Sequence, residues 1–168
     1  MCERLGQLRE AMGRYASSFD PSLLSAEQAE CALELAAAIE KMAATVKGLA
    51  AARSCGWKEA GERSAAHHLA RVTGTSVAAA GEALETARRL ERLPAVAAAA
   101  RAGELSAQQA AAVAEAAALD PSAEARLLEK ARRSSLGELR EECARTKAGA
   151  RPDAEARRRG IHAQRFLR

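Results

Sequence analysis

The fold is decided by the stretch Leu69-Ala70-Arg71-Val72-Thr73-Gly74-Thr75-Ser76, which joins two alanine-rich segments. Its glycine favours the left-handed conformation that ends a helix, and its serine side chain accepts a hydrogen bond from the free amides that begin the next helix. The stretch Arg101-Ala102-Gly103-Glu104-Leu105-Ser106 repeats this pattern. We refer to residues 69–76 as the first corner and residues 101–106 as the second corner. Each corner predicts two helices joined by a tight turn.

The first corner has the spacing of a helix-turn-helix, in which the second helix of the pair enters the major groove of DNA. A small residue, Ala70, precedes the turn glycine by four positions. The inward face of the second helix is predicted to contain Val77, Ala80 and Leu84. Its outward positions are Thr75, Ala78, Ala79, Glu82 and Glu85. Because base readout uses Arg, Lys, Asn or Gln and glutamates repel phosphate, we expect a structural corner within a bundle rather than a recognition helix.

The composition predicts an all-α protein. Hydrophobic residues make up 48% of the 168 residues, only 2% are aromatic, and 45 residues are alanine. Alanine is the best helix former, and the β-branched and aromatic residues that favour strands are scarce. Serine caps and Asp-Pro breaks divide the chain into short segments. We therefore expect a compact multi-helix bundle of about eight or nine helices, with the first corner as its helix-turn-helix-like element.

The predicted organisation has a bundle over residues 1–150 and a basic helix over residues 151–168 that leads out of it. The bundle itself comprises an N-terminal hairpin over 3–54 and a region with both corners over 57–148. Within the hairpin, apolar side chains recur at heptad spacing, at Leu5, Leu8, Met12, Tyr15 and Phe19 and again at Leu35, Ile39, Met42, Val46 and Leu49. Two such stripes fit either an antiparallel hairpin within one chain or the seam of a homodimer.

Positive charge is concentrated at the carboxyl end of the chain. The formal charge is −2 over residues 1–130 and +6 over residues 131–168, which gives the total of +4. A basic helix of this kind can follow a phosphate backbone without reading its sequence, although a solvated helix face has the same composition. The candidate nucleic-acid contacts are Arg145, Lys147, Arg151, Arg157, Arg158, Arg159, Arg165 and Arg168.

No residue pattern indicates catalysis, metal binding or a cofactor. The four cysteines are far apart, the three histidines do not share a metal-ligand spacing, and the sequence has no nucleophile or phosphate-loop motif. We expect Cys31 and Cys143 to be small core residues and Trp57 to anchor helix packing. The chain has neither a signal peptide nor an apolar run long enough to span a membrane, so we expect a cytoplasmic protein. No small-molecule substrate is evident from the sequence.

The sequence resembles DUF222, the actinobacterial helical domain of unknown function that precedes HNH endonuclease domains. The resemblance covers roughly residues 30–168. It depends on Gly61–Ala70, Leu90-Glu91-Arg92-Leu93-Pro94, Ala102-Gly103-Glu104-Leu105-Ser106, Asp120-Pro121, Leu127–Arg132 and Ser135–Arg140.

The resemblance implies an accessory module of an HNH-endonuclease-like protein that positions DNA without catalysing a reaction. Its relatives bind a divalent metal through His and Asn residues in a downstream HNH domain, and this chain lacks those residues. We therefore expect the chain alone to be no enzyme, and to be either a fragment of a nuclease or a relative without the nuclease part. The alternative function is a protein-interaction or oligomerisation module that does not bind nucleic acid.

Overall fold

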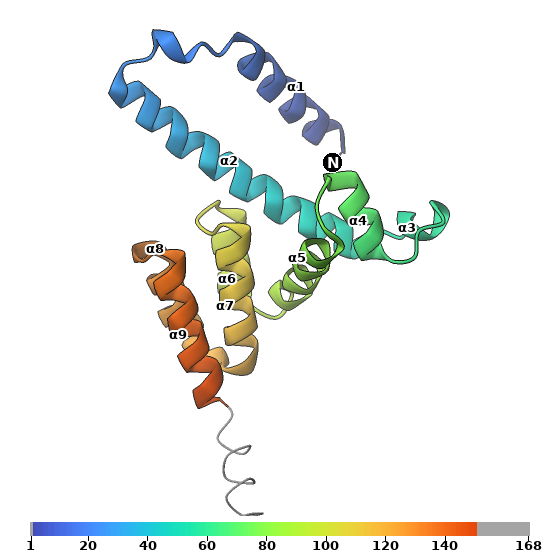
Figure 1. Cartoon of the computed structure of the whole chain (residues 1–168), viewed down its shortest axis with the longest axis vertical. Helices are drawn as coiled ribbons and strands as arrows, with labels where there is room; N and C mark the ends of the chain where they lie inside the picture. Colours follow the sequence, from blue (N-terminus) through green and yellow to red (C-terminus); the bar gives the residue numbers. More distant parts are fainter. Residues whose placement is uncertain (1, 151–168) are drawn as a thin grey trace, which may run out of the picture. The chain divides into compact units, whose positions relative to one another are not determined.

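A computed structural model describes residues 2–150 of the chain (Figure 1). This part contains nine α-helices and two short 3-10 helices, and no strand occurs among the described residues. The predicted all-α fold is therefore confirmed. The chain divides into two compact units, Met1–Ala37 and Ala38–Arg168, so the boundary between them lies within α2 (Ala26–Arg53). The predicted basic helix over 151–168 lies outside the described residues.

The first unit contains α1 (Cys2–Ser18), η1 (Pro21–Leu23) and the start of α2. Asp20 caps η1, because its carboxylate accepts hydrogen bonds from the hydroxyl and the backbone amide of Ser22, and these bonds lower the pKa of Asp20. Ser25 and Gln28 form a capping box at the start of α2, with N···O distances of 2.9 and 3.2 Å. Local sequence signals thus account for both helix starts.

The apolar stripe of α1 is exposed in the structure. The exposed fractions of its five side chains range from 41% at Met12 to 67% at Leu8. The rings of Tyr15 and Phe19 contact each other, with centroids 5.6 Å apart. The heptad spacing therefore predicted the helix correctly, and its apolar residues form no buried core among the residues described.

The second unit contains the rest of α2 and all later elements. These are α3 (Gly56–Glu59), α4 (Ala65–Thr73), α5 (Val77–Leu90), α6 (Pro94–Arg101), α7 (Ala107–Leu119), η2 (Pro121–Ala123), α8 (Glu124–Arg133) and α9 (Leu136–Gly149). Four of these helices begin at serines, and two of these serines belong to the corners. Each serine hydroxyl accepts a hydrogen bond from a first-turn amide, at Ser64, Ser76, Ser106 and Ser135.

The core of the second unit is built around α7, which contacts α5, α6, α8 and α9. The larger cluster of buried residues contains Val96, Leu105, Val113, Leu127 and Leu139, with many alanines between them. A smaller cluster joins α4 to α5 through Leu69, Ala70, Ala80 and Leu84. Small side chains dominate both clusters, so the helices pack at close range.

The face of α2 that packs in the second unit is not its apolar stripe. Ile39, Met42 and Val46 are exposed, whereas Gly48 is buried. A Cβ at Gly48 would lie 3.6 Å from the carbonyl oxygen of Ala83, so α2 approaches α5 through its small residues. Because α2 and α5 are this close at Gly48, the larger side chains of the α2 stripe lie outside the contact between the two helices.

Two predictions about buried residues are wrong. Cys31 is exposed, whereas Cys143 is buried as predicted. Val77 is 43% exposed, because it occupies the first position of α5, at the end of the helix rather than within its packed length. The other two inward positions of α5, Ala80 and Leu84, are buried as predicted.

Candidate functional site

Two of the eight candidate nucleic-acid contacts belong to the described residues, and both lie near the end of α9. The other six, Arg151, Arg157, Arg158, Arg159, Arg165 and Arg168, lie outside the described residues. Arg145 forms ion pairs with Glu142 and, at 3.8 Å, with Glu141 on its own helix. The ammonium of Lys147 lies 3.0 Å from the carboxylate of Glu115 on α7. Both cations are therefore balanced by carboxylates of the bundle.

The two corners have the predicted backbone geometry. Gly74 ends α4 at φ +67°, and the amide of Thr75 donates to the carbonyl of Ala70 across 3.1 Å. Gly103 has φ +76°, and a Cβ at this position would lie 2.8 Å from the carbonyl oxygen of Ala38. The second corner therefore needs glycine both for its left-handed conformation and for its contact with α2.

The outward face of α5 offers little to nucleic acid. The positions predicted to face outward are exposed, at Thr75, Ala78, Ala79, Glu82 and Glu85. Glu85 forms an ion pair with Arg88, and both residues lie on the same helix. Alanine and glutamate supply no hydrogen-bond donor to a base edge or to a phosphate. The exposure of these positions is confirmed, and the structural role of this corner stays a prediction.

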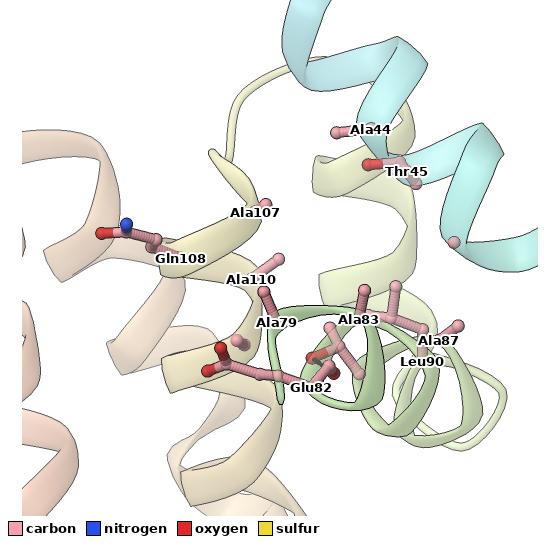
Figure 2. A pocket seen from close by; sticks show the side chains of 13 residues that line it. Ala44, Thr45, Ala79, Glu82, Ala83, Ala87, Leu90, Ala107, Gln108 and Ala110 are labelled. Atoms are coloured by element: carbon pink, nitrogen blue, oxygen red, sulfur yellow. Dashed lines mark hydrogen bonds between the residues drawn. The ribbon is translucent and has the colours of Figure 1, made fainter. Parts of the chain in front are cut away.

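An apolar groove of about 220 Å³ lies between α2, α5 and α7 (Figure 2). Its walls are mostly alanine, and its polar side chains are Thr45, Glu82, Thr86 and Gln108. The hydroxyl of Thr45 lies 3.1 Å from the carbonyl oxygens of Lys41 and Ala100. The hydroxyl of Thr86 donates to the carbonyl of Glu82 across 2.8 Å. Both threonines have local partners, so the groove supplies apolar surface rather than reactive groups.

A polar cleft between α5, α7 and α9 shares Glu82 and Gln108 with the apolar groove. The guanidinium of Arg140 lies 3.5 Å from the side-chain oxygen of Gln108. The cleft is also lined by Cys143, whose side chain is buried. Burial raises the pKa of the Cys143 thiol, and a protonated thiol is a poor nucleophile. Lys147, which lines the same cleft, and Arg126 act to lower the pKa of this thiol, but the effect of burial is larger and the thiol is not activated.

The described residues contain no group of three or more His, Cys, Asp or Glu side chains that could hold a metal ion. His67 Nδ1 lies 2.9 Å from the hydroxyl of Ser64, and His68 Nδ1 lies 3.4 Å from the guanidinium of Arg71. The two histidines therefore have separate local partners. No helix within residues 2–150 is long and apolar enough to cross a membrane.

A third cleft, of about 590 Å³, is basic. We call it the basic cleft, and its charged lining residues are Arg53, Lys58, Glu85 and Arg88. They come from the end of α2, from α3 and from α5, and Trp57 lines the same cleft. The ammonium of Lys58 lies 5.5 Å from the centroid of the Trp57 ring, within the range of a cation–π contact.

The family model for the domain of unknown function DUF222 matches residues 24–168. The chain belongs to this family. No curated protein and no solved structure matches the chain.

The DUF222 match begins within the first unit, directly after the last residue of η1, and it includes the whole second unit. Both corners, the apolar groove, the polar cleft and the basic cleft therefore belong to the DUF222 domain, whereas α1 precedes it. The match gives the domain a family, and the family description gives it no activity.

The basic cleft of this DUF222 domain was missed by the sequence analysis. Lys58 follows the only tryptophan of the chain, and Arg53 lies five residues before it. Those neighbours are a local signal that could have drawn attention to the segment. Arg88 lies 30 residues beyond Lys58, and no local pattern connects it to the other two cations. Only the packing of α5 against the end of α2 brings the three together.

Proposed function

We propose that the chain is a non-catalytic module that holds DNA through the arginines that follow α9. One observation carries this proposal, namely the segregation of charge along the chain. Residues 1–150 contain 20 basic and 20 acidic side chains, whereas residues 151–168 contain six arginines and two acidic side chains. A neutral bundle followed by a segment of formal charge +4 is suited to backbone contacts that do not depend on sequence.

The ion pairs of α9 support assigning these contacts to the arginines beyond residue 150. A phosphate that binds Arg145 must compete with Glu141 and Glu142, and one that binds Lys147 must compete with Glu115. The contribution of Arg145 and Lys147 to DNA affinity is therefore expected to be smaller. The principal contacts in this proposal are Arg151, Arg157, Arg158, Arg159, Arg165 and Arg168.

The proposal assigns the chemistry to another part of the polypeptide. The resemblance to domains that precede HNH endonucleases supports a role as the accessory part of such a nuclease, with the divalent metal held by the HNH domain. A nuclease assay on the 168-residue chain with Mg²⁺ or Mn²⁺ is expected to show no cleavage. Metal-dependent turnover by this chain alone would contradict the non-catalytic role.

Fluorescence anisotropy with labelled duplex DNA tests the DNA contact. The triple variant Arg157→Gln/Arg158→Gln/Arg159→Gln is expected to flatten the salt dependence, because each lost phosphate contact lowers the slope of log K against log salt by about 0.9. The matched control is Arg89→Gln/Arg92→Gln/Arg101→Gln, which removes the same charge from the neutral bundle. Equal loss of affinity in both variants, or no binding of the unmodified chain at low salt, would overturn the proposal.

A second function, self-association, is favoured by the exposed stripe of α1. Five apolar side chains at heptad spacing are typical of a helix that packs against a second helix with the same spacing. Sedimentation at several concentrations tests this function. The variant Leu8→Glu/Met12→Glu places two acids on the stripe and is expected to prevent association. The control Gln7→Glu/Ser17→Glu places two acids away from the stripe and should leave association intact. A strict monomer at every concentration would exclude this function.

A further inference from the structure

The basic cleft lies where the end of α2, α3, the first turn of α4 and α5 meet, and all of these belong to the second unit. Its three cations and single carboxylate give the lining a net charge of +2. Cationic side chains that share a concave surface raise the local concentration of anions, because their fields add. The cleft is therefore a candidate anion site, separate from the arginines that follow α9.

The cations of the basic cleft are only partly neutralised by the protein. Within residues 2–150 no carboxylate lies within 4.0 Å of the Lys58 ammonium. The nearest carboxylate of Arg53, from Glu91, lies at 3.9 Å, and the Arg53 side chain is 84% exposed. Arg88 pairs with Glu85. An incoming anion thus meets two cations with little competition and a third that an ion pair already orients.

The cleft also has an aromatic wall and hydroxyl groups. Trp57 is half-buried and lines the cleft beside Lys58. The hydroxyl oxygen of Ser54 accepts a hydrogen bond from the amide of Gly56 across 3.2 Å, and its proton can be donated to a ligand. Ser64, the N-cap residue of α4, also lines the cleft. Cations with a neighbouring indole are the combination that single-stranded nucleic acid uses, since the strand presents phosphates and unstacked bases together.

We propose that the basic cleft binds a single-stranded nucleic acid, with a phosphate between Arg53, Lys58 and Arg88 and the adjacent base against Trp57. This inference rests on the proposed function in that the ligand is a nucleic acid, but it uses different residues from the arginines beyond α9. Lys58 turns from the Trp57 ring toward the phosphate, which frees that face of the indole for the base. A duplex satisfies the phosphate contacts but keeps its bases stacked inside, so it does not reach Trp57.

Trp57 is the only tryptophan in the chain, so its fluorescence reports on this cleft alone. The full chain is titrated with an oligothymidylate of about ten nucleotides, a length that a single-strand site of ordinary size accommodates. Binding is followed by Trp57 emission and by anisotropy of a label on the oligonucleotide. We expect saturable quenching of Trp57 that weakens as salt is raised. Duplex DNA of the same length is expected to bind with little quenching.

Variants connect the signal to the cations. Arg53→Gln/Lys58→Gln is expected to lower the affinity measured by Trp57 quenching by about tenfold at low salt, because two phosphate-neutralising charges are lost. The matched control is Arg92→Gln/Arg101→Gln, two exposed arginines outside the cleft, which is expected to retain the affinity of the unmodified chain. Trp57→Leu is expected to lower the affinity measured by anisotropy by about tenfold, since the stacked base loses its partner. Far-UV circular dichroism establishes that each variant is folded.

The results separate this inference from the proposed function. Quenching that persists in Arg157→Gln/Arg158→Gln/Arg159→Gln supports the cleft even if duplex binding by the later arginines fails. Oligonucleotide binding by anisotropy without any change in Trp57 emission overturns the cleft and leaves the proposed function standing. Equal affinities of Arg53→Gln/Lys58→Gln and its control also overturn it. Inorganic phosphate that quenches Trp57 as strongly as the oligonucleotide overturns the assignment to a nucleic acid.

Discussion

The carboxylate of Glu124 accepts a hydrogen bond from the backbone amide of Val96, 28 residues away, across 3.0 Å. The residue before α6 is Leu93, whose side chain cannot cap the helix, and α6 begins with Pro94. Glu124, in the first turn of α8, therefore supplies the cap that the local sequence lacks. The contact connects two helices of the core and places a negative charge at the positive end of α6.

The Glu124 cap predicts a specific pattern of stabilities. Glu124→Ala is expected to lower the free energy of unfolding by about 1 kcal/mol or more, because it leaves the Val96 amide without a partner. Glu124→Gln retains an oxygen acceptor and is expected to lose less. Urea denaturation followed by circular dichroism measures both. A Gln variant as unstable as the Ala variant would mean that the hydrogen bond does not account for the loss.

Gly103 and Gly81 are expected to respond to the same substitution in opposite directions. Gly103→Ala adds a Cβ 2.8 Å from the Ala38 carbonyl oxygen, at φ +76°. It is expected to destabilise the second unit by about 2 kcal/mol or more, because strain and overlap add. Gly81 lies within α5 with no neighbouring atom within 4 Å of the added Cβ. Gly81→Ala is therefore expected to stabilise by about 0.5–1 kcal/mol through helix propensity.

Thermal denaturation of the two variants measures this contrast. If Gly103→Ala leaves the midpoint unchanged or raises it, the left-handed turn and the close approach of the second corner to α2 are not maintained in solution. Gly81→Ala also controls for the general effect of replacing glycine by alanine in the unfolded chain, which both variants share.

The serines and glycines made most helix boundaries predictable. Which face of a helix packs against which neighbouring helix was not predictable. Ser76 and Ser135 act on amides three residues away, so their effect is present in any short segment of sequence. The burial of Gly48 instead depends on Ala83 and Ala87 of a later helix. In an alanine-rich helix both the apolar stripe and the small-residue face can pack, and the close approach that small residues permit decided the outcome for α2.

The candidate site was predictable to a smaller extent for the same reason. The arginines after α9 form a run in the sequence, so charge counting found them. The basic cleft depends on Arg88 reaching the end of α2, and a helix presents a given side chain to a distant partner only once the packing is known. Packing also changed the interpretation of a cation that the sequence did identify. Lys147 was predicted to contact phosphate, but its ammonium lies 3.0 Å from the carboxylate of Glu115 on another helix.

The capping box of α9 predicts a dependence of stability on pH. The backbone amide and hydroxyl of Ser135 donate to the carboxylate of Glu138, both across 2.9 Å, and lower the pKa of Glu138 below its ordinary value of 4.5. A carboxyl whose pKa is lower in the folded state stabilises that state at pH values above its ordinary pKa. This contribution is lost as the pH falls through the folded-state value.

Comparison of the chain with Glu138→Gln tests this linkage. The unmodified chain is expected to be the more stable at pH 7, and the difference should shrink as the pH is lowered below 4.5. Midpoints of thermal unfolding at intervals of pH measure the difference. A gap between the two proteins that stays constant across this range would show that the charge of Glu138 does not contribute to the cap.

The four cysteines are expected to fall into two classes of reactivity. Cys143 is 2% exposed, and burial raises the pKa of its thiol, whereas Cys2, Cys31 and Cys55 are exposed. Because the thiolate is the species that is alkylated, native protein treated with iodoacetamide at pH 8 should gain three labels rapidly. The fourth label should appear only at the rate at which the second unit opens, and adding urea should accelerate it. Intact-mass spectrometry counts the labels, and Cys31→Ser is expected to reduce the rapid class to two. Rapid labelling of all four cysteines in the native protein would contradict the packing of α9 against α7, because Cys143 belongs to the core that those two helices share.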